Sequence, residues 1–193
     1  MGERPTAAAH RVVAEVVRPG DLVVDATAGN GHDTAFLAGL VGEGGRVMAF
    51  DVQEEAIRST ADRLEAAGLA DRVELRLESH GRLLERVGRG TVSAVMLNLG
   101  YLPGGDHERI TEVGESCKAV VQGLFSLKEG GMVTVVCYTG HPGGKEEADA
   151  VVETLERIEG SQEPPIEVEI MRASRDDAPF LVIVRRCRGD GAN

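Results

Sequence analysis

The sequence contains few aromatic residues and few cysteines. Only 3% of its 193 residues are aromatic, with no Trp, two Tyr and four Phe. The three cysteines, Cys117, Cys137 and Cys187, form no C-x-x-C pair, and an odd number leaves at least one of them unpaired. Two of them lie in apolar strand-like runs, so we expect small buried side chains rather than disulfides or metal ligands.

Long apolar segments are also missing. No stretch approaches the roughly 20 apolar residues of a membrane span, and the first ten residues, MGERPTAAAH, lack the apolar core of a secretory signal, so we expect a cytoplasmic protein. Acidic residues outnumber basic ones, 32 to 21, so the net charge is −11. This argues against broad non-specific binding of nucleic acid, which depends on exchanging counterions for Lys and Arg, although it allows a local basic patch.

The pattern of apolar residues predicts a single α/β domain. With 42% hydrophobic residues the chain can form one full core, which we place at about residues 16–187, leaving 188–193 as a frayed tail. Short apolar runs alternate with helical patterns, as in a parallel sheet covered by helices on both faces. The expected strands are 22–26, 46–51, 72–77, 92–97, 132–138, 167–171 and 180–186. The expected helices are 33–40, 54–67, 81–86, 116–127 and 145–158.

The end of the chain departs from this alternation. The last two expected strands are separated by RASRDDAP, which is too short for a helix, so they should form an antiparallel hairpin at one edge of the sheet. A mostly parallel sheet of six or seven strands that ends in a reversed strand is the Rossmann-like architecture of class I methyltransferases. We therefore expect that fold.

The first expected strand runs directly into the turn DATAGNGHDT, residues 25–34. In an open α/β sheet, this first turn between strand and helix normally contributes to the ligand site. Gly29 and Gly31 let the backbone approach a ligand closely, while Asp25 can accept a hydrogen bond from the turn or from an ammonium group. The turn is not the dinucleotide fingerprint G-x-G-x-x-G, because its third position is Thr34, and it lacks the G-K-[ST] of a P-loop.

Acidic and polar residues end the next two expected strands. Asp51 follows the glycines by about 20 residues, where a carboxylate can accept both hydroxyls of a ribose. The combination predicts an adenosine-containing ligand, and because no pyrophosphate site is evident we favour S-adenosylmethionine over NAD. The third strand leads to Ser79 and His80, where such folds commonly contact adenine. Capping the helix that follows is an alternative role for His80.

A further polar segment follows the fourth expected strand. Residues 98–106 read NLGYLPGGD, which resembles the [DN]-P-P-[YFW] loop of amino-methylating enzymes. An attacking nitrogen must point its lone pair at the sulfonium methyl group, so an acceptor for its hydrogens, such as the Asn98 side chain, fixes its orientation. Tyr101 is placed to stack on a base, which is worth roughly 1–3 kcal/mol. The alternative roles are structural, with Asn98 ending a strand and Tyr101 filling a groove.

The fifth expected strand brings His141 to the same edge, as a candidate for contacting substrate or acting as a base. An aliphatic ammonium group must lose a proton before it attacks, and Asp33 and Asp106 are further candidates for the base. The sequence does not rank the three. A positive rim for RNA is expected from Arg82, Arg86, Arg89, Lys145, Arg172 and Arg175.

Together, the segments DATAGNGHDTAFLA, AFDVQEEAI, NLGYLPGGD, YTGHPGGKEE and DAPFLVIV resemble the family labelled "putative rRNA methylase". Its bacterial members are assigned as the tRNA methyltransferase acting on 5-aminomethyl-2-thiouridine at the wobble position. The resemblance covers about residues 16–184. It implies S-adenosylmethionine as donor, S-adenosylhomocysteine as product, and methyl transfer to the aminomethyl nitrogen of U34, giving 5-methylaminomethyl-2-thiouridine. It also implies the tRNA anticodon arm as partner. Because a monomer of this size is small for wrapping an anticodon arm, we expect a homodimer.

The resemblance assigns roles to individual residues. The methionine side of the donor would be lined by residues of the first turn, namely Asp25, Thr27, Gly29, Asn30, Gly31, His32, Asp33 and Thr34. Asp51 and Gln53 would hold the ribose and the nearby adenine, with Ser79 and His80 beside them. The reacting centre would comprise Asn98, Tyr101, Asp106 and His141. Methylation of rRNA or of a small molecule, an NAD-dependent oxidoreductase and a non-catalytic adenosine-binding module stay open as alternatives.

Overall fold

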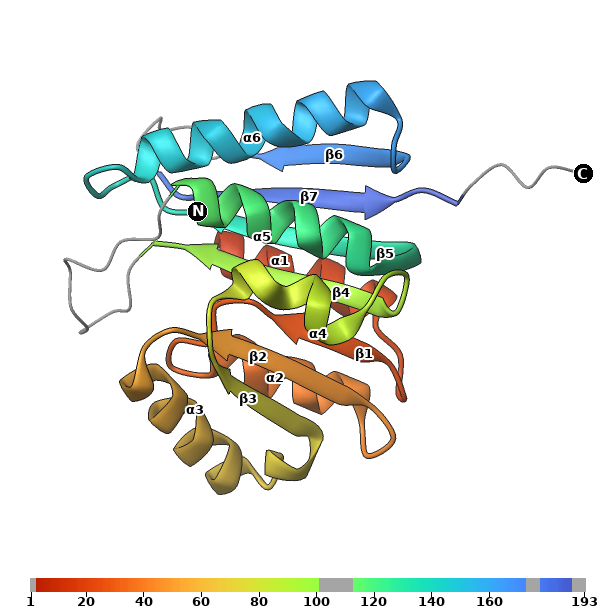
Figure 1. Cartoon of the computed structure of the whole chain (residues 1–193). Coiled ribbons are helices and arrows are strands. Elements are labelled where there is room, and N and C mark those ends of the chain that lie inside the picture. Colours follow the sequence, from red (N-terminus) through yellow and green to blue (C-terminus); the bar gives the residue numbers. More distant parts are fainter. Residues whose placement is uncertain (1–2, 101–112, 173–177, 189–193) are drawn as a thin grey trace, which may run out of the picture.

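The computed structural model describes residues 3–100, 113–172 and 178–188. Its strands are β1 (Leu22–Asp25), β2 (Arg46–Asp51), β3 (Val73–Leu77), β4 (Val92–Leu99), β5 (Leu127–Cys137), β6 (Ile166–Met171) and β7 (Phe180–Arg186) (Figure 1). Its α-helices are α1 (Pro5–Val16), α2 (His32–Val41), α3 (Glu54–Ala67), α4 (Leu83–Val87), α5 (Val113–Ser126) and α6 (Gly144–Ser161), with short 3-10 helices η1 (Ala70–Arg72) and η2 (His80–Arg82).

The strands form one sheet in the order β3-β2-β1-β4-β5-β7-β6. The pairs between β3, β2, β1, β4 and β5 are parallel, and β7 runs antiparallel to both of its neighbours, β5 and β6. The predicted hairpin and the class I methyltransferase architecture are thus confirmed. Because the chain moves outward from β1 in one direction and then resumes at β4 on the other side, the switch point lies between β1 and β4.

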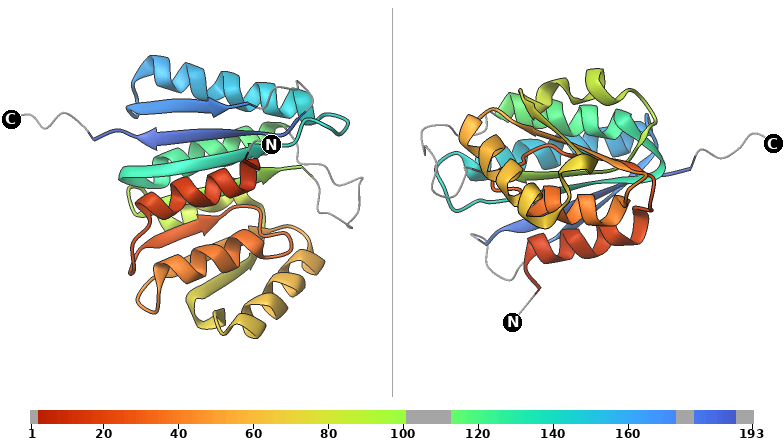
Figure 2. Two further views of the ribbon diagram at one scale, coloured as in Figure 1. Left: turned by 180° about the vertical axis from the view of Figure 1, so that it is seen from behind. Right: turned by 90° about the horizontal axis from the view of Figure 1, so that it is seen from below.

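Helices cover both faces of the sheet (Figure 2). One face carries α1, α2 and α3, whose buried residues include Val13, Leu37 and Leu64, and the other carries α4, α5 and α6, with Leu83 and Leu124 among the buried residues. The central strands are buried on both sides, which explains why their sequences read as continuous apolar runs rather than as alternating patterns.

The packed core begins earlier than the predicted residue 16. Helix α1 starts with Pro5 in its first turn, a position where the missing N–H of proline costs nothing. Its residues Ala8, Ala9, Val12 and Val13 are buried and belong to the same hydrophobic cluster as α2. The N-terminal helix is therefore part of the domain rather than an appendage. Residues 189–193 of the predicted tail lie outside the described residues.

One boundary differs clearly from the expectation. The helix expected to reach Leu127 ends at Ser126, and β5 starts at Leu127, which pairs with Val92. The sequence predicted a strand only from residue 132 because two charged residues and two glycines interrupt the apolar run. A Cβ atom on Gly131 would lie 2.9 Å from the carbonyl oxygen of Lys128, so glycine is needed where this strand passes close to its neighbours.

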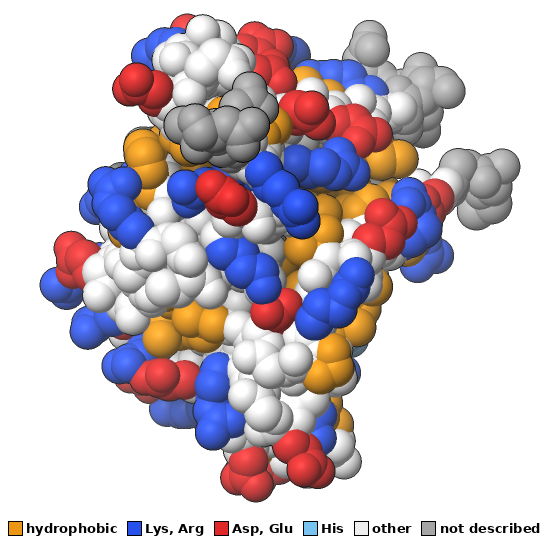
Figure 3. Space-filling view, turned by 90° about the vertical axis from the view of Figure 1, so that its right-hand side faces the viewer, with side chains coloured by type: hydrophobic (Ala, Val, Ile, Leu, Met, Phe, Trp, Pro, Cys, Tyr) orange, Lys and Arg blue, Asp and Glu red, His pale blue; other side chains and the backbone are white. Residues whose placement is uncertain are grey.

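The edge of the sheet where β1 and β2 begin carries charges of both signs. Figure 3 looks onto this edge and shows Lys and Arg side chains gathered there among Asp, Glu and apolar residues. Lys128, for example, lies 2.6 Å from a carboxylate oxygen of Asp21.

Within the described ranges, no helix is long and apolar enough to cross a membrane. Cys117, Cys137 and Cys187 are free thiols, and burial raises the pKa of Cys137 to about 12, as expected for a small buried side chain.

Candidate active site

The carboxyl ends of β1, β2, β4 and β5 meet at one edge of the sheet, the left edge in Figure 1. The turn after β1 leads into α2 at this edge, beside the switch point where ligands of open α/β sheets bind. The polar side chains that the sequence singled out after these strands are therefore brought to one place.

The glycine turn is shaped by its contact with α3. Gly29 and Gly31 both have positive φ, +52° and +76°, and Gly31 precedes the first residue of α2. A Cβ atom on Gly31 would lie 2.9 Å from the Cα atom of Thr60, and the Thr60 hydroxyl donates to the Gly29 carbonyl at 3.0 Å. The turn is thus held against α3, which leaves the free N–H groups at the start of α2 as a site that favours negative charge.

Two side chains of the turn also face α3. The Asn30 amide oxygen accepts a hydrogen bond from Ser59 at 3.3 Å, and Arg63 donates to the Asn30 carbonyl at 2.6 Å. The Nε2 atom of His32 lies 3.1 Å from a guanidinium nitrogen of Arg63. These contacts engage the side chains of Asn30 and His32 with a helix, so the backbone of the turn is the better candidate for contacting a ligand.

Asp25 points into the protein. It is fully buried, and it accepts hydrogen bonds from the Thr34 hydroxyl at 2.6 Å and from the Thr27 N–H at 3.1 Å. Burial, together with the nearby negative charge of Asp33, raises the pKa of Asp25 to about 7. The sequence allowed Asp25 to accept a hydrogen bond from the turn or from an ammonium group, and the structure shows hydrogen bonds from the turn.

Asp51, at the end of β2, joins two segments. One carboxylate oxygen accepts the N–H of Gly29 and the other accepts the N–H of Gln53, both at 2.9 Å. Each carboxylate oxygen can accept more than one hydrogen bond, so both can still accept ribose hydroxyls. The next residue, Val52, is 56% exposed. Sequence reasoning did not single out Val52, although an apolar residue just beyond a strand end could have signalled a surface for a ligand ring.

The loop after β3 is anchored on both sides. The Ser79 hydroxyl accepts the Gly81 N–H at 3.1 Å, which caps η2, and donates to Glu115 of α5 at 2.8 Å. His80 reaches the carbonyl oxygen of Ala26 at 2.9 Å through Nδ1, and burial lowers its pKa, so the ring is neutral and donates. Capping is thus done by Ser79, while His80 connects this loop to the turn after β1.

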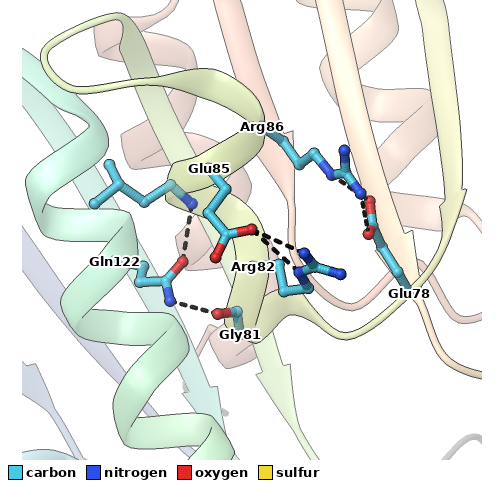
Figure 4. A network of polar contacts seen from close by, with 7 residues as sticks. Glu78, Gly81, Arg82, Glu85, Arg86 and Gln122 are labelled. Carbon is cyan, nitrogen blue, oxygen red and sulfur yellow. Dashed lines mark hydrogen bonds and ion pairs between the residues drawn. The ribbon is translucent and has the colours of Figure 1, made fainter.

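The following helix is fixed by α5 and by ion pairs (Figure 4). The Gln122 side chain accepts the N–H of Leu84 at 2.9 Å and donates to the Gly81 carbonyl. Arg86 makes two hydrogen bonds to Glu78, and Arg82 pairs with Glu85. These contacts hold the loop rigidly, and they also neutralise two of the cations predicted to form a positive rim.

The other described members of the predicted rim are engaged as well. Lys145 pairs with Asp149, while the guanidinium groups of Arg89 and Arg172 lie over the rings of Phe125 and Phe180. Carboxylates thus compensate Arg82, Arg86 and Lys145, whereas Arg89 and Arg172 keep their charge and are held against aromatic rings. Arg175 lies outside the described residues, as do Tyr101 and Asp106 of the predicted reacting centre.

Asn98 is held at both its backbone and its side chain. Its N–H donates to the Thr27 hydroxyl at 2.8 Å, and its side-chain Nδ2 donates to Asp33 at 2.6 Å. The other oxygen of Asp33 lies 2.6 Å from Nε2 of His10 on α1. Within the described ranges, the buried Oδ1 of Asn98 has no hydrogen-bond partner. A buried acceptor without a hydrogen bond destabilises the folded protein unless a ligand donates one to it.

Asp33 is ionised. Burial alone would raise the pKa of this carboxyl, but the hydrogen bonds from His10 and Asn98 outweigh burial and hold the pKa below its ordinary value. Sequence reasoning considered Asp33 as a base and missed His10, which lies 23 residues away in the chain. Only the packing of α1 against the sheet brings the two together, so no local pattern could have revealed the contact.

The end of β5 adds two side chains to the site. Measured from a Cβ atom built on Gly100, the Tyr138 ring lies 3.6 Å away and Nε2 of His141 3.8 Å away. Tyr138 is 37% exposed, and burial of its hydroxyl, with the charge of Asp33, raises its pKa. The expected placement of His141 at the edge of Asn98 is confirmed. Tyr138 was not predicted, although it is one of only two tyrosines in the chain.

The sheet order, the reversed β7 and the glycine turn beside an acidic strand end define the fold of a class I methyltransferase. Residues 47–185 match the family described as "Putative rRNA methylase", and the chain belongs to that family. The chain is similar to a protein of Clostridium thermocellum described as a "putative rRNA-methylase", with a TM-score of 0.90, 38% identity, and coverage of 96% of this chain and 99% of the other.

A Streptococcus mutans protein described as "a putative methyltransferase", solved in complex with SAH, is similarly close, with a TM-score of 0.85, 31% identity, and coverage of 96% and 99% of the two chains. The chain is also 39% identical over 158 residues to the chloroplastic tRNA (mnm(5)s(2)U34)-methyltransferase of Arabidopsis thaliana. That match takes in 77% of this chain, and it spans 58% of the plant protein.

Proposed function

We propose that the protein transfers a methyl group from S-adenosylmethionine to the aminomethyl nitrogen of 5-aminomethyl-2-thiouridine at the wobble position of tRNA. The observation that carries this proposal is the Asn98 side chain, whose Oδ1 is buried and unpaired within the described ranges while its Nδ2 is held by Asp33. Support for the substrate comes from the name of the Arabidopsis relative.

The described residues fit the donor. The turn at Gly29 and Gly31 exposes backbone N–H groups at the start of α2, which suits the carboxylate of a methionine moiety. Asp51 retains acceptor capacity for ribose hydroxyls, and the exposed Val52 offers an apolar surface beside it. The SAH-bound Streptococcus mutans neighbour supports the same ligand class. S-adenosylmethionine supplies an electrophilic methyl group on a sulfonium sulfur.

Asn98 would orient the nucleophile. Its Oδ1 would accept one hydrogen of the substrate amine, so that the nitrogen lone pair points at the methyl carbon. As the N–C bond forms, the S–C bond breaks with its electron pair staying on sulfur, and the amine loses a proton. Tyr138, Tyr101 and His141 would contact the base or the amine at the same edge, and Asp106 would complete the reacting centre.

The proton acceptor is proposed from geometry. Both oxygens of Asp33 already accept hydrogen bonds, and its charge favours an ammonium ion over a neutral amine. The His141 side chain brings no negative charge that would favour the ammonium ion. Its ring lies beside Gly100, two residues after Asn98. We therefore favour His141 over Asp33 as the residue that takes the proton.

The partner would be the tRNA anticodon arm, bound in the cytoplasm by a homodimer. Arg82, Arg86 and Lys145 of the expected rim are paired with carboxylates, so a second subunit would add contacts to the RNA. Sedimentation of the protein with and without an anticodon stem-loop tests this part, and a monomer with bound stem-loop would contradict it.

The decisive assay incubates the purified protein with labelled S-adenosylmethionine and tRNA from a strain lacking the wobble methyl group. Digestion to nucleosides should place the label in 5-methylaminomethyl-2-thiouridine. Label in rRNA instead would favour methylation of rRNA, the alternative that the family's description suggests. If calorimetry shows binding of NADH but no binding of S-adenosylhomocysteine, the assignment of S-adenosylmethionine as the donor is wrong.

A further inference from the structure

Helix α1 lies outside the segment that matches the family, and it brings a histidine into contact with the site. His10 stacks on Phe36 of α2, with parallel rings whose centroids are 3.8 Å apart. Its Nε2 lies 2.6 Å from one oxygen of Asp33. The ring is thus fixed in two ways, by its face and by its edge.

The second oxygen of Asp33 controls the Asn98 side chain. An ionised carboxylate can only accept hydrogen bonds, so Asn98 must turn its Nδ2 toward Asp33, as observed at 2.6 Å. The Oδ1 atom is then directed away from Asp33, where the described residues leave it without a partner. The orientation of this amide therefore depends on Asp33 being charged and fixed.

We propose that His10 is a positioning residue of the methyl-transfer site, acting through Asp33 to keep the Asn98 oxygen turned toward the substrate amine. This inference rests on the proposed function. His10 itself contacts neither of the reacting groups, and its role is to donate a hydrogen bond to Asp33.

The physical reason is the burial of Asp33, which is only 8% exposed. Losing one of two donors leaves a buried carboxylate poorly compensated, and such a group tends to take up a proton. A protonated carboxyl can donate to an amide oxygen, so both orientations of the Asn98 amide become acceptable. The flipped Asn98 amide would present its NH2 group to the substrate amine. That NH2 group would repel the N–H groups of the amine and would turn the nitrogen lone pair away from the methyl carbon.

Two variants separate the donor from the ring. His10→Phe keeps an aromatic face on Phe36 and removes the donor, whereas His10→Gln removes the ring and retains an N–H donor. We expect His10→Phe to lower turnover at saturating tRNA by roughly tenfold or more, with affinity for S-adenosylhomocysteine unchanged, and His10→Gln to recover most of the loss. Glu15→Gln, an exposed change on the same helix, is the matched control.

A second measurement does not depend on activity. In selectively labelled protein, the side-chain NH2 signals of Asn98, assigned by their loss in Asn98→Ala, should show one strongly hydrogen-bonded proton. His10→Phe should shift these signals and speed their exchange with water, and His10→Gln should restore them. If this pattern is seen in a protein that does not methylate tRNA, the proposed function fails while the positioning role stands.

Unchanged Asn98 signals and unchanged turnover in His10→Phe would overturn the inference. So would equal losses of turnover in His10→Phe and His10→Gln together with matching losses of thermal stability, because that result describes a structural residue only. Should His10→Phe not fold, Asp33→Asn tests the same connection from the other side. An amide at that position can donate to Oδ1, so turnover should fall and the Asn98 NH2 signals should shift as expected for His10→Phe.

Discussion

The carboxylate of Asp51 accepts the N–H of Gly29, which lies 22 residues earlier in the chain, at 2.9 Å. Its other oxygen accepts the N–H of Gln53. The acid at the end of β2 therefore shapes the ligand edge in addition to offering acceptors for a ribose. Removing it should change both the turn and the affinity for the donor.

Asp51→Ala is expected to weaken binding of S-adenosylhomocysteine by about 2–3 kcal/mol, because it removes charged acceptors from ribose hydroxyls. Asp51→Asn retains one oxygen for the Gly29 N–H, so it should lose less. Isothermal titration calorimetry measures both. Equal affinity in wild type and Asp51→Ala would count against a ribose role for this residue.

Asn98→Ala should lower turnover roughly 100-fold, because the amine loses the acceptor that aligns its lone pair. Donor affinity should stay within about twofold, since Asn98 is assigned to the nucleophile rather than to the adenosine. Single-turnover methylation of tRNA measures the first quantity and calorimetry the second. Glu156→Ala, at an exposed position of α6, is the control. Parallel losses of turnover and donor affinity would assign Asn98 to the fold or to donor binding.

The sequence predicted most of the framework because buried strands are recorded in local patterns. The bounds of β2 and β7 match the expectation, and so do those of α3, which is followed by Gly68 with a positive φ of +66°. The position of Asn98 at a strand end could be predicted in the same way. Each of these features depends on neighbours within a few residues.

The remaining features depend on packing between distant segments. His10 reaches Asp33 only because α1 lies against β4, β5 and β7, and nothing in the sequence around His10 records that contact. Asp25 turns inward because Thr34, in the first turn of α2, offers it a hydroxyl. For His10 and for Asp25, only the three-dimensional arrangement shows that the side chain contacts another part of the protein.

Asp25 should give the protein a distinctive dependence of stability on pH. Because its pKa is raised to about 7 in the folded state, the folded protein keeps a proton that the unfolded chain has lost. Stability from this group is therefore lost as pH rises from about 4 to about 7, by an amount on the order of a few kcal/mol.

The Asp25→Asn variant removes this titration. The free energy of unfolding of Asp25→Asn minus that of wild type should be larger at about pH 8 than at about pH 5, because only the wild type loses stability over this range; urea denaturation at both values measures it. A constant difference across that range would show that Asp25 ionises normally. Asp71→Asn, at an exposed position, provides the comparison for a carboxyl outside the site.

Gly31→Ala should destabilise the protein by about 1–3 kcal/mol, because the residue has a φ of +76° and a Cβ atom would press on the Thr60 backbone. Donor binding should weaken with it. Gly39→Ala, within the helix α2 that follows Gly31, is the matched control, since no atom lies within 4 Å of its added Cβ atom. That change should be neutral or stabilising by about 0.5–1 kcal/mol. Thermal and chemical unfolding measure the pair.

Tyr138→Ala should weaken binding of an anticodon stem-loop by roughly 1–3 kcal/mol if the half-exposed ring stacks on a base. Tyr138→Phe should bind almost as well as wild type, because stacking needs the ring rather than the hydroxyl. Fluorescence anisotropy with a labelled stem-loop distinguishes the two. Equal affinity for all three proteins would remove Tyr138 from the RNA-binding surface.

The position of β7 between β5 and β6 has a consequence for how the chain acquires its structure. Among the strands of the described residues, β6 is hydrogen-bonded only to β7, although β6 precedes β7 in the sequence. During synthesis β6 therefore has no partner strand until β7 has left the ribosome. The outer part of the sheet should be the last to gain protection from amide exchange in a pulse-labelling experiment on refolding, after the parallel strands around β1 and β4 have assembled.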